Sequence, residues 1–252
     1  PVPVLILVLA FHTLAQEPPA PVKWIDASTL TIQGKGWLET KLPFDRLPAK
    51  AESLVRKPVW NLSRNTAGVA VRFVTDATTL KVRWTLLQEN LAMPHMPATG
   101  VSGLDLYVKQ QGAWHWLGAG RPQNFPINEA TLYNHILPGK RDYVLYLPLY
   151  NGASKVELGV APECLLEPTP ADTTKAIVWY GTSITQGGCA SRPGMAASSI
   201  LSRRLNREFI NLGFSGNGIM EPEMAQLLAE LDPAAYILAN LENLKPEEVY
   251  TR

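Results

Sequence analysis

The pattern of apolar residues changes near residue 170, and this change limits the possible folds more than any other feature of the chain. Before it, short runs alternate apolar and polar residues between turns, as β-strands do. After it, apolar runs alternate with segments of helical period, the order typical of a parallel α/β sheet. We therefore predict two domains, an N-terminal β-sandwich of jelly-roll type over residues 16–168 and an α/β/α domain over residues 172–252.

The predicted strands of the first half share a period of two and are bounded by turn residues. They are Val69–Val74, Thr79–Leu86, Leu104–Val108, Trp114–Leu117, Arg141–Tyr150 and Lys155–Val160. Gln110-Gln111-Gly112 and Asn151-Gly152 separate the last two pairs, so we predict two hairpins there. Leu165–Lys175 is rich in Pro and Thr and is predicted to be a linker.

The second half contains three predicted strands with two helices between them. The strands are Ala176–Tyr180, Phe209–Leu212 and Ala235–Leu241, and the helices are Met195–Leu205 and Glu221–Leu231. Only about 80 residues remain for this domain, whereas a doubly wound domain usually needs about 150. We therefore expect the α/β/α domain to be truncated at its C-terminal side.

Charge and composition exclude several classes of function. The 23 basic and 22 acidic residues leave a net charge of +1, so no basic surface for nucleic acid is expected. Two cysteines are too few for a disulfide scaffold or a four-cysteine zinc site. No His, Asp or Glu residues show metal-ligand spacing, so we predict neither a metal nor a cofactor.

The first 15 residues resemble part of a secretory signal peptide. The apolar run Val4–Phe11 is shorter than the roughly 20 residues that span a bilayer. Thr13-Leu14-Ala15 would then be the cleavage site, with the true start missing. The alternative is a buried N-terminal strand. We expect an exported protein, periplasmic or secreted, without a transmembrane segment.

Three polar blocks follow the three predicted parallel strands, where open α/β sheets place their sites. Ser183 lies in Gly181–Thr185, Gly216 lies in a glycine-rich loop, and Asn240 and Asn243 follow the third strand. A serine between a strand and a helix could act as a nucleophile, with nearby N–H groups facing an oxyanion. Alternatively, Ser and Thr here could cap a helix. A P-loop is disfavoured because no Lys follows the glycines.

Together the blocks resemble the SGNH (GDSL) hydrolase superfamily. Gly181–Thr185 is similar to its Gly-Asp-Ser-Leu motif, with Thr182 where Asp commonly stands. The longer run Tyr180–Gly194 resembles a branch whose N-terminal β-domain carries a Gly-x-Asp-Leu-Tyr signature. Gly103–Tyr107 supplies that signature. The resemblance therefore extends over both halves of the chain, from about residue 24 to the end.

This resemblance implies a role for each catalytic candidate. Ser183 would be the nucleophile, and the Gly216 amide and the Asn243 side chain would form the oxyanion hole with the Ser183 amide. Asn240 is a rival for the role of Asn243. The Asp-x-x-His pair of the family is absent and is expected beyond residue 252, since all histidines precede the serine. They are His12, His95, His115 and His135. We expect the present chain to be inactive alone.

The resemblance implies an exported serine esterase that acts through an acyl-Ser183 intermediate. The substrate would be a small-molecule or carbohydrate ester, and the seven Trp residues favour a carbohydrate acetylesterase. The alternative is a non-catalytic carbohydrate-binding or scaffold protein with a vestigial hydrolase portion. Neither the substrate-binding residues nor the oligomeric state follows from the sequence.

Several other residues admit two interpretations each. Trp114 and Trp116 share a strand face and could stack on sugars or pack in the sandwich core. Met93–Pro97 could reach over the active site or be merely structural. Asp105 is expected to anchor a turn or pair with Arg. Finally, two cysteines could form an interdomain disulfide or remain separate thiols. These are Cys164 and Cys189.

Overall fold

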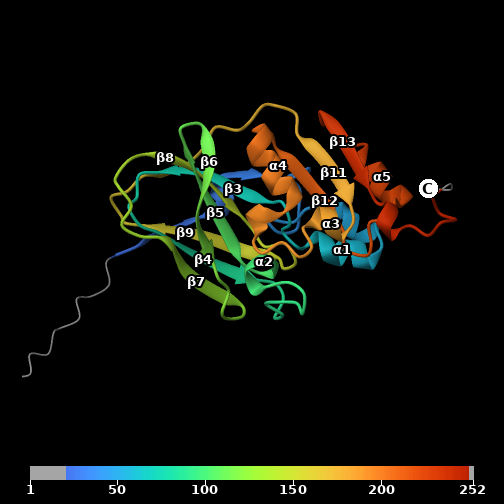
Figure 1. Cartoon of the computed structure of the whole chain (residues 1–252), viewed down its shortest axis with the longest axis horizontal. Helices are drawn as coiled ribbons and strands as arrows, with labels where there is room; N and C mark the ends of the chain where they lie inside the picture. Colours follow the sequence, from blue (N-terminus) through green and yellow to red (C-terminus); the bar gives the residue numbers. More distant parts are fainter. Residues whose placement is uncertain (1–20, 250–252) are drawn as a thin grey trace, which may run out of the picture.

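The protein is mostly β-structure, arranged in three sheets (Figure 1). A computed structural model describes residues 21–249, so the predicted signal peptide lies outside the described residues. No helix within the described range is both long enough and apolar enough to cross a membrane.

Two antiparallel sheets make up most of the first half. The four-stranded sheet has the order β1 (Lys23–Asp26), β9 (Ala153–Val160), β4 (Leu80–Leu86) and β7 (Ile127–Tyr133). The six-stranded sheet has the order β10 (Leu166–Pro168), β3 (Ala70–Thr75), β8 (Arg141–Tyr146), β5 (Leu104–Gln110) and β6 (Ala113–Gly120), and β2 (Thr31–Gln33) also pairs with β3. Short helices connect them: η1 (Ala27–Thr29), η2 (Ala49–Ser53), α1 (Lys57–Ser63) and α2 (Ala98–Val101).

The largest apolar core contains side chains from both antiparallel sheets. Val82 and Trp84 come from the four-stranded sheet, and Leu104, Leu106 and Leu145 come from the six-stranded sheet. Along β4 every second residue is buried, as expected for a strand with one face toward a core. Two sheets that enclose one core form a sandwich, which is how we describe this half.

The sequence predicted the pairing of one hairpin correctly and of the other wrongly. β5 pairs with β6 as expected. In contrast, β8 pairs with β3 and β5, whereas β9 pairs with β1 and β4 in the other sheet. The Asn151 amide donates to Gln88 O and to Ser102 Oγ, which fixes the chain where it crosses between sheets. The predicted linker also begins with strand β10, which pairs with β3.

The second half forms a parallel sheet of order β12 (Phe209–Gly213), β11 (Ile177–Gly181) and β13 (Ala235–Ala239), so the predicted order of elements is confirmed. Its helices are α3 (Ser183–Gln186), η3 (Pro193–Met195), α4 (Ala197–Leu205), α5 (Pro222–Leu228) and η4 (Leu241–Asn243). Because β11 is the central strand, the residues that follow it lie at the middle of the carboxyl edge.

Part of the first half packs against this parallel sheet (Figure 1). Leu47 and Val59, from the segment that contains η2 and α1, share an apolar core with Val178, Leu212 and Met224. Between β10 and β11, residues 170–175 are exposed. Residues well before position 168 therefore help to build the α/β half of the molecule.

Candidate active site

Ser183 is the first residue of α3, directly after the central strand. The Thr182 side chain caps this helix by accepting a hydrogen bond from the Ile184 amide at 3.4 Å. A Cβ atom on Gly181 would lie 2.1 Å from Thr185 Oγ1, so only glycine fits in this turn. Ser183 is partly exposed, and no side chain of residues 21–249 hydrogen-bonds to its hydroxyl. The hydroxyl is therefore accessible at the carboxyl edge of the sheet.

The loop after β12 passes beside Ser183. The Phe214 amide donates to Gly181 O at 2.9 Å, which joins this loop to the turn before the serine. The Ser215 amide donates to Gln186 Oε1 at 2.9 Å, which joins it to α3. Gly216 is exposed with φ +67°, and its amide has no acceptor among the described residues. An unpaired N–H beside the serine is what an oxyanion donor requires.

Asn240 is buried beneath the loop that follows β12, and Asn243 lies beside the same loop. A Cβ atom on Gly218 would lie 2.1 Å from Gly181 O and 3.0 Å from Asn240 Nδ2, so all three blocks meet here. Asn243 Nδ2 is 3.4 Å from Gly218 O, a long hydrogen bond. Asn240 is only 1% exposed, and neither amide atom has a partner among the described residues. The candidates predicted from the sequence are thus brought together. Both asparagines remain candidates for the oxyanion donor.

Two arginines from the first half hold the Gly216 loop, and no sequence pattern marks either of them. Arg46 is fully buried, and its guanidinium donates to Gly213 O at 2.8 Å and to Asn211 O at 3.1 Å. Burial lowers the pKa of Arg46 to about 9. Arg56 donates to Asn217 O at 3.0 Å. The oxyanion candidate loop therefore depends on the N-terminal half.

The Gly-x-Asp-Leu-Tyr signature joins the two halves on the side of η3. Asp105 accepts hydrogen bonds from the Gly194 amide at 3.0 Å and from Arg192 Nε at 3.1 Å. Burial raises the pKa of Asp105, and the charge of Arg192 opposes this rise. A Cβ on Gly194 would lie 2.3 Å from the Tyr107 ring. The prediction that Asp105 pairs with an arginine is confirmed.

The described histidines do not complete a catalytic triad. His95, His115 and His135 are exposed, and none of them hydrogen-bonds to Ser183; His12 lies outside the described residues. Within residues 21–249, no three His, Cys, Asp or Glu side chains are grouped so that they could hold a metal ion.

The two tryptophans do not lie in the sandwich core, so that interpretation is wrong. Trp116 is 52% exposed, and Trp114 packs against the outer face of the six-stranded sheet. These positions of β6 point away from the opposite sheet, because the strand alternates its two faces.

Cysteines and the Met93–Pro97 loop also have defined positions. Cys164 and Cys189 are both free thiols, which leaves the interpretation of two separate thiols and excludes the disulfide in this structure.

Met96 is buried against Ala190 and its neighbours. The loop therefore contacts the segment that follows α3, and Met96 has a packing role.

Comparisons with known proteins identify a family for each half of the chain. A family profile described as the N-terminus of an SGNH-hydrolase-type esterase matches residues 22–166. A second profile, the GDSL-like lipase/acylhydrolase family, matches residues 174–252. The chain belongs to the SGNH, or GDSL-like, hydrolases. No curated protein matches this chain.

Two solved structures of other proteins resemble the chain in fold. A candidate GDSL-like lipase from Bacteroides ovatus ATCC 8483 is 35% identical, with a TM-score of 0.88; the match covers 92% of this chain and 68% of that one. A salicylyl-acyltransferase from a tetracycline biosynthetic pathway is 19% identical, with a TM-score of 0.69, and the match covers 85% of this chain and 60% of that one. The second likeness concerns the fold alone.

Proposed function

We propose that the protein is a serine esterase with Ser183 as its nucleophile. The observation that carries this proposal is the meeting of Ser183, the unpaired Gly216 amide and the Asn243 side chain at the carboxyl edge of the parallel sheet. Acyl transfer needs such a nucleophile and donors that converge on one oxygen. Membership in a family of hydrolases that act on esters supports the same reaction.

The reaction would proceed in two balanced steps. A base removes the Ser183 proton while Oγ attacks the carbonyl carbon of the ester, and the amides of Ser183 and Gly216 stabilise the oxyanion. The ester C–O bond breaks, and the alcohol leaves with that proton. Water then attacks the acyl-serine and releases the acid. Because no described histidine contacts Ser183, the base would come from outside residues 21–249.

The finer features of this proposal rest on the sequence. Export is supported by the apolar run Val4–Phe11 and the small residues that follow it. Ester-linked carbohydrate as the substrate is supported by the seven Trp residues of the chain. We also propose that residues 16–168 and 172–252 are separate domains that share the packing described above, the second of them truncated.

The test is hydrolysis of an aryl acetate by the protein together with the sequence that flanks these 252 residues in its gene. Ser183→Ala should lower kcat/KM by at least about 10³-fold while leaving thermal stability nearly unchanged. Ser191→Ala is the matched control, because Ser191 is exposed in the following loop and its hydrogen bond with Thr99 is made by the backbone carbonyl, which the substitution keeps. Equal activity in Ser183→Ala would rule out the proposed nucleophile.

A second candidate, a non-catalytic carbohydrate-binding protein, is favoured by two observations. Trp116 is exposed, and the Ser183 hydroxyl has no basic partner within the described chain. This candidate predicts carbohydrate binding with no ester hydrolysis in wild type, so the same assay separates the two functions.

A further inference from the structure

A groove of about 600 Å³ lies between strand β6 and helix α4. Its walls include Tyr107, Trp114 and Trp116 from the sandwich, and Arg192, Arg203 and Arg204 from the α/β half. Figure 1 shows α4 beside the six-stranded sheet. Neither Ser183, Gly216 nor Asn243 lines this groove, so it is a separate feature from the candidate active site.

The ring of Trp116 has a fixed orientation at the edge of the groove. Its Nε1 donates to Asp105 Oδ1 at 2.8 Å, and the Arg192 guanidinium lies 4.8 Å from the ring centroid. Because the ring is anchored at one edge and 52% exposed, it offers a preformed aromatic surface at little cost in side-chain entropy. The apolar face of a sugar ring packs well on such a surface.

The groove is also positively charged. Arg203 is held by its bond to Gly194 O at 2.7 Å and by stacking on Tyr107 at 3.8 Å. Arg204 is exposed, and neither it nor Arg203 forms an ion pair within residues 21–249. Asp105 is buried behind the groove and is paired with Arg192. No carboxylate of the described chain lines the groove, so its charge is complementary to an anion.

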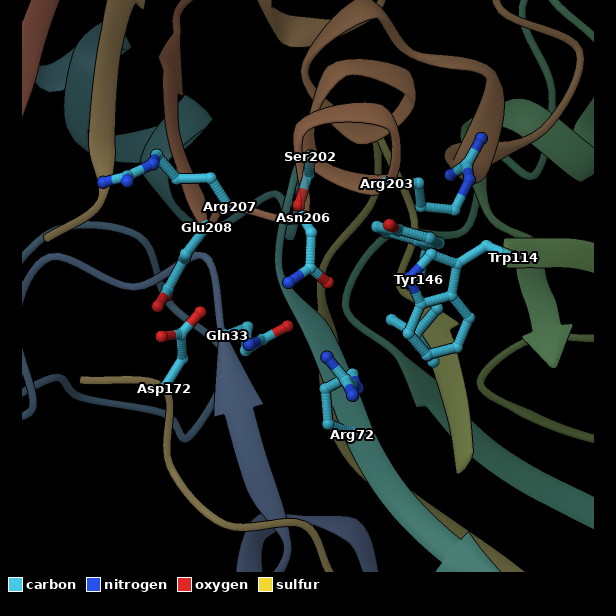
Figure 2. Close-up of a pocket in the computed structure, with 11 residues that line it drawn as sticks. Gln33, Arg72, Trp114, Tyr146, Asp172, Ser202, Arg203, Asn206, Arg207 and Glu208 are labelled. Carbon is cyan, nitrogen blue, oxygen red and sulfur yellow. The ribbon is translucent and has the colours of Figure 1, made fainter. Parts of the chain in front are cut away.

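A smaller hollow adjoins the groove and has a different charge balance. It shares Trp114 and Arg203 with the groove, and Figure 2 shows Arg72 beside Trp114. Asp172 and Glu208 line the same hollow, and in Figure 2 their carboxylates point toward each other. Three arginines, Arg72, Arg203 and Arg207, line the hollow with these two carboxylates, whereas the groove at Trp116 has arginines and no carboxylate in its lining.

We propose that this groove binds an acidic oligosaccharide that contains uronic acid residues. One sugar ring would stack on the exposed face of Trp116, and a carboxylate of the chain would pair with the Arg204 guanidinium. A neutral sugar would lack the ionic contact, and a small inorganic anion would lack the stacking contact. This binding requires no chemistry at Ser183 and goes beyond the proposed esterase function.

The test is calorimetric titration of the chain with a galacturonic acid tetramer and with a neutral xylose tetramer. We expect the acidic tetramer to bind at least about tenfold more tightly and to lose affinity as salt is added. Trp116→Ala and Arg204→Glu should each weaken its binding about tenfold or more. Arg204 is exposed, so Arg204→Glu tests the groove even if Trp116→Ala fails to fold.

Arg83→Ala is the matched control for these variants. Arg83 also stacks on a tryptophan, Trp24, at 4.2 Å, but it lies on the four-stranded sheet and pairs with Glu129. Its substitution should leave binding unchanged. Equal affinity for the two tetramers, absence of binding, or unchanged binding in Arg204→Glu would each overturn the proposal. Because no ester is present, these outcomes are independent of the proposed esterase activity.

Discussion

The guanidinium of Arg46 donates a 2.8 Å hydrogen bond to the carbonyl oxygen of Gly213, the last residue of β12. The same group also bonds to carbonyls of Leu62, Asn65 and Asn211, and it lies 4.9 Å from the Phe214 ring centroid. One side chain of the N-terminal half therefore fixes the start of the loop that presents the Gly216 amide. The N-terminal half would thus position the proposed oxyanion donor.

Replacing Arg46 should impair both stability and turnover. Arg46→Met removes a buried side-chain donor from four backbone carbonyls, so we expect a loss of about 2–4 kcal/mol in the free energy of unfolding. In a stable background, kcat should fall more than KM rises, because the oxyanion donor is displaced. Denaturant unfolding and steady-state kinetics measure the two effects.

The control for this variant is Lys50→Met, which removes an exposed ion pair with Glu230. It should change the unfolding free energy by less than about 1 kcal/mol. An Arg46→Met protein with unaltered kcat would show that the Gly216 loop does not need this anchor.

Two glycines of the same loop should differ in how strongly their substitution lowers activity. Gly216 has φ +67° and open space where a Cβ would stand, so Gly216→Asn should keep activity within about threefold. A Cβ on Gly218 would lie 2.1 Å from Gly181 O, so Gly218→Ala must displace the loop and should reduce kcat at least about tenfold. If Gly216→Asn is the more damaging change, the loop geometry described here is wrong.

Substitution of Asn243 and of Asn240 should have different effects on kcat. If Asn243 is the oxyanion donor, Asn243→Ala should lower kcat by about 10²–10³ with little change in KM, since the bond strengthens only in the transition state. Asn240 is only 1% exposed and lies beneath the surface that a substrate would contact, so Asn240→Ala should leave kcat nearly unchanged. The reverse pattern would transfer the role to Asn240.

Glu208 should make stability depend on pH. Burial raises the pKa of Glu208 above its usual value of 4.5, the charge of Asp172 adds to this, and the hydrogen bond from the Gly34 amide opposes it. At a pH between the usual pKa of 4.5 and the raised pKa in the folded protein, Glu208 holds a proton that the unfolded chain has released. The unfolding free energy contributed by Glu208 therefore falls as pH rises through that interval.

Glu208→Gln should remove this contribution. Its melting temperature at about pH 7 should equal or exceed that of wild type, and its change between about pH 4.5 and 7 should be smaller. Glu129→Gln, which alters an exposed carboxylate paired with Arg83, is the control. A Glu208→Gln protein that melts well below wild type at neutral pH would mean that the carboxylate stabilises the fold.

Local patterns predicted the elements well and their partners less well. The strands and helices of the second half follow from hydrophobic period, and Ser183 follows from its place between a strand and a helix. The pairing of β8 and β9 did not follow, because Asn151-Gly152 has the local signature of a hairpin turn while side-chain bonds of Asn151 direct the chain to the other sheet.

Polar contacts between residues far apart in the chain could not be predicted from the sequence either. Arg46 lies 165 residues before Asn211, and no periodicity marks a buried arginine that binds only carbonyls. The positions of Trp114 and Trp116 were open because alternation shows that they share a face but not which face looks toward the core. The histidine partner of Ser183 has no candidate among the described residues.

Covalent labelling tests directly whether Ser183 is the nucleophile. The protein, with its flanking gene sequence, should react with a fluorophosphonate, and peptide mass mapping should locate one adduct on Ser183. Ser183→Ala should remain unlabelled, and Ser191→Ala should be labelled like wild type. Labelling that persists in Ser183→Ala, or that maps to another residue, would contradict the assignment of Ser183 as the nucleophile.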